Sequence, residues 1–175
     1  MNSQVMVAAA PRVKVVEPGG GRRGHLAPGV DVIFKIGGED SGGALSIVEH
    51  PFEVGALVPP HTHTLEDEYS IVLEGKIGFR SNDQEVVLGP GGYIVKPRGE
   101  LHAMWNAGST PARLIEVISP AGFENFFREF ADLTDAGRPD PAAIAEIAAR
   151  YQLPFAQPAW LPDVIARYKL TPPPG

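Results

Sequence analysis

The residues of this chain with the clearest chemistry are two histidines separated by one residue, His61 and His63. If residues 61–63 are extended, alternation along the strand places both imidazoles on one face. Carboxylates follow at residues 66–68, and a further imidazole is available at His102. Imidazoles and a carboxylate that converge on one point suit a divalent metal ion. The chain has no cysteine, so any bound metal must be held by nitrogen and oxygen atoms.

Two other histidines are expected to lie on the surface. His25 is in a stretch rich in glycine and proline, which predicts an exposed loop. His50 precedes Pro51 at the end of a strand-like segment and has no partner at ligand spacing. Neither is therefore predicted to bind the metal.

Composition excludes several classes of partner. The net charge of −6 argues against binding to nucleic acid or to anionic lipid. No apolar run approaches the roughly 18 residues of a membrane span. The first ten residues have no basic residue before their short apolar stretch, so they do not resemble a secretory signal. We expect a cytoplasmic protein.

The elements that position these residues are predicted to be short antiparallel strands. Segments of alternating apolar and polar residues recur between glycine-rich turns, a spacing typical of an all-β sandwich or barrel. The predicted strands are residues 12–17 at an edge, then 31–36, 44–49, 76–80, 85–88, 93–95, 101–106 and 112–118.

The character of the chain changes near residue 120. Four phenylalanines at helical spacing predict an apolar stripe that packs on the barrel; they are Phe123, Phe126, Phe127 and Phe130. Asp140 and Pro141 suit the start of a second helix at 142–151, and a short third helix is predicted at 164–168. We therefore divide the chain into a barrel with an N-terminal arm at 1–120, whose core is about 30–120, and a helical extension at 121–175.

Two segments share a spaced design. The first reads Gly55, five residues, His61, one residue, His63, four residues, Glu68, six residues, Gly75. The second reads Gly91, five residues, Pro97, one residue, Gly99, two residues, His102, three residues, Asn106. This pattern resembles the two motifs of the cupin superfamily, and in particular its single-domain bacterial members. The resemblance implies a double-stranded β-helix, also called a jelly roll or cupin barrel.

The resemblance also implies the ligands of one divalent ion. Carried over by position, they are His61, His63, Glu68 and His102. The spacing selects Glu68 as the carboxylate, and Glu66 or Asp67 is then expected to face solvent. Iron, nickel, manganese, cobalt and zinc all suit such a site, and the sequence does not choose among them.

Alternation from Glu68 predicts the lining of a substrate pocket. The candidates are Leu45, Ile47, Ser70, Val72, Ile77, Phe79 and Met104. This lining is mostly apolar, and no Arg or Lys is evidently directed at the metal. A sugar or phosphate substrate is therefore disfavoured, and a flat aromatic or enol substrate fits better.

A single cupin followed by an aromatic helix resembles the quercetinase-like cupins, which open flavonol rings with dioxygen. By this resemblance the chain is an oxidoreductase in which Glu68 is both a metal ligand and the catalytic base. Two alternatives stay open: a non-redox cyclase, isomerase or lyase of a biosynthetic pathway, and a non-catalytic cupin that binds a small molecule. Exposed sheet edges favour a homodimer.

Overall fold

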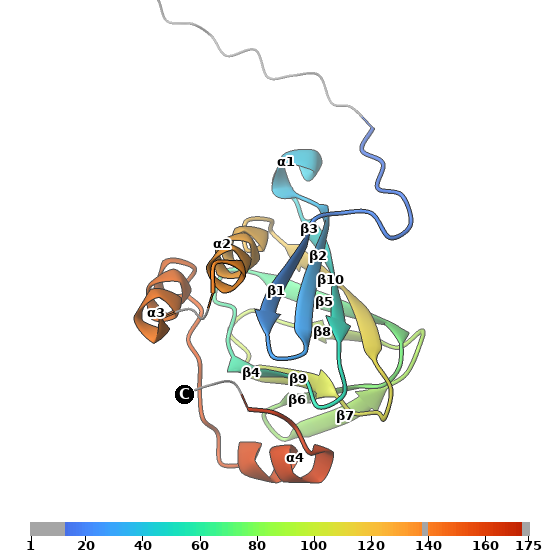
Figure 1. The fold of residues 1–175 in the computed structure, drawn as a ribbon, viewed down its shortest axis with the longest axis vertical. Helices are drawn as coiled ribbons and strands as arrows, with labels where there is room; N and C mark the ends of the chain where they lie inside the picture. The colour runs from blue at the N-terminus through green and yellow to red at the C-terminus, as the bar shows by residue number, and fades with distance from the viewer. Residues whose placement is uncertain (1–12, 138–139, 173–175) are drawn as a thin grey trace, which may run out of the picture.

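The computed structural model describes residues 13–137 and 140–172, which form two antiparallel sheets and four helices (Figure 1). The first sheet has the order β1 (Arg23–Ala27), β2 (Val30–Ile36), β3 (Ser46–Phe52), β10 (Ala112–Ser119), β5 (Asp67–Glu74) and β8 (Tyr93–Lys96). The second has the order β4 (Leu57–His61), β9 (His102–Asn106), β6 (Ile77–Ser81) and β7 (Gln84–Leu88). The helices are α1 (Gly38–Ser41), α2 (Glu124–Asp135), α3 (Pro141–Arg150) and α4 (Leu161–Tyr168). The predicted all-β jelly roll with C-terminal helices is confirmed.

The two sheets enclose an apolar core. Val72 and Leu114 of the six-stranded sheet pack against Ile77, Phe79 and Met104 of the four-stranded sheet, and all five side chains are buried. The alternating burial of β10 and β5 puts one row of side chains into this core and the next row outside. The sequence pattern of period two therefore accounts for the barrel.

Helices cover the part of the six-stranded sheet that the smaller sheet does not face. Phe126 and Phe127 of α2 share a buried cluster with Val32 of β2 and Val48 of β3, and α2 lies beside β1 (Figure 1). The phenylalanine stripe is thus a docking face, as predicted. The third helix in the chain, α3, begins where expected, because the carboxylate of Asp140 accepts a hydrogen bond of 3.0 Å from the backbone of Ala142.

The last helix docks on the other sheet. Trp105 of β9 is fully buried and packs against Leu161 and Val164 of α4. A Cβ on Gly78 of the neighbouring strand would collide with the indole of Trp105, so glycine is required for this close approach. At the edge of this contact, Arg167 forms two hydrogen bonds of 2.9 and 2.7 Å with Glu85 of β7.

Several local predictions differ from the structure. Residues 13–17 of the predicted edge strand are not in a strand, and Arg12 lies outside the described residues. The edge strand is instead β1, which contains His25 and pairs with β2. The short helix α1 was not predicted. Gly75 does form a turn as expected, because its φ is +71° and a Cβ there would lie 2.6 Å from the Cβ of Ala112.

The prediction of a surface position for His50 is wrong. Its ring is 1% exposed and packs edge-on against Phe127, with ring centroids 5.1 Å apart. Its Nδ1 donates to the carbonyl of Asp31 at 2.9 Å. The strand continues through Pro51, which pairs with Arg113, so the proline does not end β3 where the sequence suggested.

The burial of His50 predicts a loss of stability in mild acid. Burial lowers the pKa of His50 to about 4, against 6.5 for an exposed histidine, and the bond to Asp31 offsets this only in part. Between these values the unfolded chain binds the extra proton. The stabilisation is therefore fully present above about pH 6.5 and falls by about 3 kcal/mol as the pH drops towards 4.

Urea unfolding of wild type and His50→Asn between pH 7 and pH 5 will measure this effect, since asparagine does not titrate there. We expect the free energy of unfolding of wild type to fall more steeply with acid than that of the variant. His25→Asn is the matched control, because the side chain of His25 is 52% exposed. Equal pH slopes for wild type and His50→Asn would contradict the prediction.

Candidate metal centre

The four predicted ligands meet at one end of the barrel. His61 ends β4 and pairs across the sheet with His102, the first residue of β9. His63 lies just beyond β4, and Glu68 enters from β5 of the other sheet. All four are buried, and one ligand atom from each lies within 4.8 Å of the others. The sequence therefore identified a group of side chains that could hold a metal ion.

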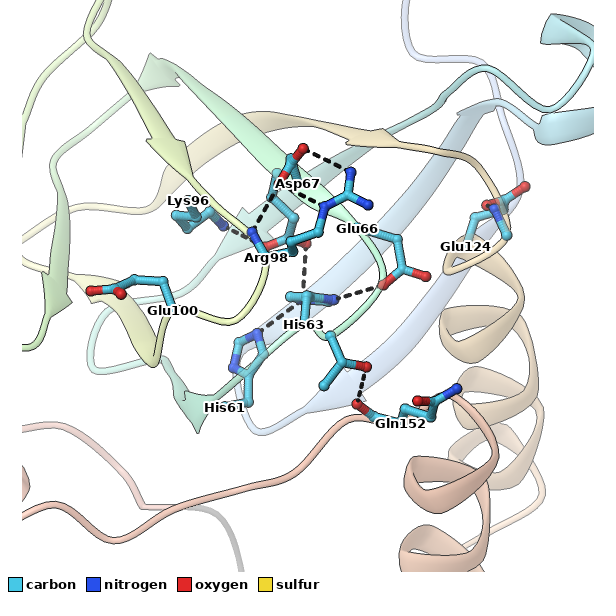
Figure 2. Close-up of polar contacts among 12 residues, drawn as sticks. His61, His63, Glu66, Asp67, Lys96, Arg98, Glu100, Glu124 and Gln152 are labelled. Carbon is cyan, nitrogen blue, oxygen red and sulfur yellow. Dashed lines mark hydrogen bonds and ion pairs between the residues drawn. The ribbon is translucent and has the colours of Figure 1, made fainter.

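The backbone fixes the protonation of two imidazoles. Nδ1 of His61 lies 2.8 Å from the carbonyl of Pro59, and Nδ1 of His102 lies 3.0 Å from the carbonyl of Glu100. A carbonyl only accepts, so each Nδ1 carries the proton and each Nε2 keeps a free lone pair. The two Nε2 atoms of His61 and His63 are 3.2 Å apart (Figure 2). The tautomer with its proton on Nδ1 and its lone pair on Nε2 is the one that His61 and His102 need to bind a metal through Nε2.

The electrostatics of the group also suit a cation. Burial lowers the pKa of His61, and the neighbouring His102 and His63 rings lower it further. Burial likewise lowers the pKa of His102, so both rings stay neutral. Burial alone raises the pKa of Glu68, but His63, Lys96 and His102 together hold that pKa well below its ordinary value. The site thus combines the neutral imidazoles of His61 and His102 with an ionised carboxylate.

A buried nitrogen atom and the carboxylate beside it support the fit to a metal. Nε2 of His102 has no hydrogen-bond partner among the described residues and lies 3.3 Å from Oε2 of Glu68, and Oε1 of Glu68 lies 3.2 Å from Nε2 of His63. Buried polar atoms are normally satisfied, and an unsatisfied one calls for an explanation. Nitrogen and oxygen donors of this kind suit a borderline divalent ion.

The prediction that no lysine or arginine is directed at the centre is wrong. Lys96 of β8 is 3% exposed, and its Nζ lies 2.8 Å from Oε2 of Glu68 and 2.9 Å from Oε1 of Glu116. Ser70, which we expected to line the substrate pocket, instead donates to Oε1 of Glu116 at 2.8 Å. Burial raises the pKa of Glu116 to about 7, although Lys96 acts against this rise. A buried ionic network thus stands behind Glu68.

Of the two acidic residues before Glu68, one faces outward. Asp67 forms an ion pair of 2.8 Å with Arg98 (Figure 2), whose side chain is 48% exposed. Glu66 is 6% exposed, and its Oε2 lies 3.7 Å from Nδ1 of His63. This distance is too long for a hydrogen bond but close enough for Glu66 to orient the ring electrostatically.

A cavity of about 370 Å³ reaches the centre from the side of β6, β7 and β8. Its wall includes His102 and Lys96, and its other lining residues are a mixture of apolar and polar side chains. Of the predicted pocket residues, Phe79 lines this cavity. Val72, Ile77 and Met104 are packed into the core between the sheets.

Two predicted pocket residues do not face the core. Ile47 pairs with Val117, which pairs with Tyr69, and Tyr69 is 40% exposed on the outer face of the sheet. Its neighbours Ser46 and Val48 are the residues of β3 that point inward. Leu45 lies before β3 and two residues from Ile47. The alternation of β3 is as predicted, but its inward row is Ser46 and Val48 instead of Ile47.

Residues far along the chain cover the other side of the centre. The ring of Phe123 packs edge-on against His63 at 4.2 Å between centroids, and Phe155 lies 6.2 Å from His61. Residues 154–156 continue the edge of β4, because Thr62 donates to the carbonyl of Pro154 at 3.1 Å. No local pattern predicts this contact, which joins positions more than 90 residues apart.

Comparison with known proteins agrees with the cupin resemblance of the two motifs. The family model for the cupin domain matches residues 49–118. The tetracenomycin polyketide synthase protein TcmJ of Streptomyces glaucescens is 36% identical over 66 residues, which are 38% of this chain and 44% of that protein. Quercetin 2,3-dioxygenase of Bacillus subtilis is 28% identical over 94 residues, which are 54% of this chain and 28% of that protein.

Among solved structures, the polyketide cyclase RemF of Streptomyces resistomycificus is similar, with 25% identity and a TM-score of 0.54. The match covers 62% of this chain and 80% of RemF. The chain spans 28% to 45% of the length of the curated relatives that it matches, which include plant germin-like proteins. Within the described residues, no helix is long and apolar enough to cross a membrane. The spaced motifs, the jelly roll and the matched domain agree, and residues 49–118 of the chain form a domain of the cupin superfamily.

Proposed function

We propose that the chain is a metal-dependent enzyme in which His61, His63, Glu68 and His102 hold one divalent ion. The observation that carries this proposal is the convergence of four buried ligand atoms within 4.8 Å. The fixed Nδ1 protons of His61 and His102 support it, because they direct both lone pairs into the group. The preferred reaction is a dioxygenation of a small aromatic or enol substrate, by similarity to the quercetin dioxygenase.

A bound ion would supply a Lewis acid that lowers the pKa of a substrate hydroxyl. The chain's own residues bind and orient. His102 and Lys96 lie at the wall of the cavity, so a substrate there would approach the ligands from this side. Phe123 and Phe155 lie against the imidazoles of His63 and His61 and help to exclude water.

Glu68 is the proposed proton acceptor as well as a ligand. Lys96 and the imidazoles hold its pKa low, which makes it a weak base in the free site. Its role therefore requires a substrate hydroxyl whose own pKa has been lowered. Phenols and enols satisfy this condition better than simple alcohols.

A second candidate is a non-redox cyclisation. RemF is named as a polyketide cyclase and TcmJ as a polyketide synthase protein. The match with RemF covers 62% of this chain. Polyketide intermediates are rich in enols and phenols, so they meet the same condition at Glu68. The two candidates differ in whether dioxygen is consumed.

The test uses metal-loaded protein of defined content, after elemental analysis of protein purified without added metal. A flavonol and an aromatic polyketide-type enol are each incubated in air and under argon, with dioxygen uptake and products measured. We expect dioxygen uptake that matches substrate loss in air and no turnover under argon. Equal turnover under argon would support the cyclase, and metal binding without turnover of either compound would support a non-catalytic binder.

A further inference from the structure

We propose that Lys96 is a positioning residue that makes Glu68 bind the metal through a single carboxylate oxygen, which keeps room for a substrate that chelates the ion. This inference rests on the proposed metal centre.

The β-sheet places Lys96 inside the barrel. Lys96 pairs directly with Glu68 across β8 and β5, so their side chains lie on the same face of the sheet. The preceding residues Tyr93 and Val95 point outward and are 72% and 56% exposed. Alternation therefore brings a long cationic side chain to the carboxylate that is expected to bind the metal.

The network fixes the ammonium as well as the carboxylate. Nζ of Lys96 lies between Oε2 of Glu68 at 2.8 Å and Oε1 of Glu116 at 2.9 Å. Ser70 donates to the same oxygen of Glu116 at 2.8 Å. All four side chains are at most 3% exposed. A lysine buried in this way is stable only beside carboxylates, and Glu116 compensates it when Glu68 is committed to an ion.

The two oxygens of Glu68 are in different surroundings. Both oxygens lie near a ligand nitrogen, because Oε1 is 3.2 Å from Nε2 of His63 and Oε2 is 3.3 Å from Nε2 of His102. Oε2 also lies 2.8 Å from the ammonium of Lys96, and no lysine or arginine of the described residues forms an ion pair with Oε1. An ammonium and a divalent ion repel each other, so they do not share one oxygen favourably. Oε1 is therefore the oxygen left for the metal.

Binding through one oxygen has a consequence for the substrate. In an octahedron, three imidazoles and one carboxylate oxygen leave two positions open, whereas a bidentate carboxylate leaves one. A hydroxyketone or an enolised diketone needs two adjacent positions to chelate the ion. The substrate class that follows is a compound with two neighbouring oxygens.

The test compares ligands that need one or two positions. Co²⁺-loaded wild type and Lys96→Met are titrated with azide, which takes one position, and with acetohydroxamate, which chelates. The d–d absorption of Co²⁺ reports both binding and the coordination of the free site. We expect Lys96→Met to bind acetohydroxamate at least about tenfold more weakly, with little change for azide and with an altered spectrum before any ligand is added.

Two further variants make the result specific. Arg98→Met removes a cation two residues away that pairs with Asp67 on the outer face, and it should match wild type. Lys96→Met combined with Glu116→Gln removes both charges, so that Glu68 is the one member of the network left charged and the ion is its counter-charge. This double variant replaces the single variant if that chain does not fold. The double variant should show the same loss of acetohydroxamate binding.

The outcomes separate this inference from the metal centre itself. Wild-type protein that takes up no Co²⁺ would overturn both. Wild type that binds Co²⁺, together with a Lys96 variant of unchanged spectrum and unchanged preference for acetohydroxamate, would overturn the role of Lys96 alone.

Discussion

His102→Ala is expected to abolish stoichiometric metal binding and to weaken the affinity for a divalent ion by at least about 100-fold. The three remaining ligands would keep their places, but β9 would contribute no lone pair to the group. Activity that depends on the ion would be lost with it. Elemental analysis after dialysis and calorimetric titration with Zn²⁺ or Co²⁺ will measure the change.

Two other histidines provide the controls for this experiment. His25→Ala alters an exposed ring that pairs with Asp31, and His50→Asn alters a buried ring outside the group. Both variants should retain one ion per chain if wild type does. Full metal content in a folded His102→Ala chain would refute the assignment of the centre.

Trp105→Ala is expected to reduce the free energy of unfolding by about 3–5 kcal/mol. The indole is fully buried and joins β9 to Leu161 and Val164 of α4, so its removal opens a large cavity between sheet and helix. Urea unfolding will measure the loss. Limited proteolysis should also cut earlier within residues 161–170, because α4 loses its main anchor.

A buried and an exposed aromatic residue are compared in this experiment. Tyr93→Ala removes a ring that is 72% exposed and should change stability by no more than about 0.5 kcal/mol. Trp105→Phe should cost less than the alanine variant, because the indole nitrogen has no hydrogen-bond partner among the described residues. A cost below about 1 kcal/mol for Trp105→Ala would show that α4 is held by other contacts.

Much of the fold follows from local sequence. The alternation of β6 and β10, the phenylalanine stripe of α2 and the Asp140–Pro141 start of α3 each specify an element without long-range information. The group of side chains that could hold a metal ion could also be predicted, because its histidines and glutamate stand at fixed spacings between the glycines of the two motifs. The homodimer stays a prediction from the sequence.

The surroundings of the centre depend on which strands are neighbours. Lys96 is adjacent to Glu68 only because β8 pairs with β5, and Glu116 reaches Lys96 only because β10 lies on the other side of β5. Neither pairing can be derived from residues close in the chain. The predicted pocket included Ile47 because alternation along a strand defines two faces but does not say which of them points inward. The pairing of the strands places Ile47 on the outer face.

The contacts that the C-terminal third of the chain makes with the candidate metal centre could not be predicted either. A helix with an apolar stripe must dock somewhere, but nothing in residues 123–130 specifies that Phe123 reaches His63. The segment that pairs with β4 is short and interrupted by prolines, so it has no strand pattern of its own. Its structure is imposed by the edge of the sheet that it completes.

The ligands come from both sheets, and this distribution gives an ion a mechanical part in the fold. Glu68 belongs to the six-stranded sheet, whereas His61 and His102 belong to the four-stranded one. An ion bound by all of them would be a cross-link between the two layers, as a disulfide is in other small domains. Because only the folded chain assembles these ligands, an ion present at a thousand times its dissociation constant would raise the free energy of unfolding by about 4 kcal/mol. Loss of the ion would thus lower the stability of the two packed sheets, and the lifetime of the protein would depend on the supply of metal.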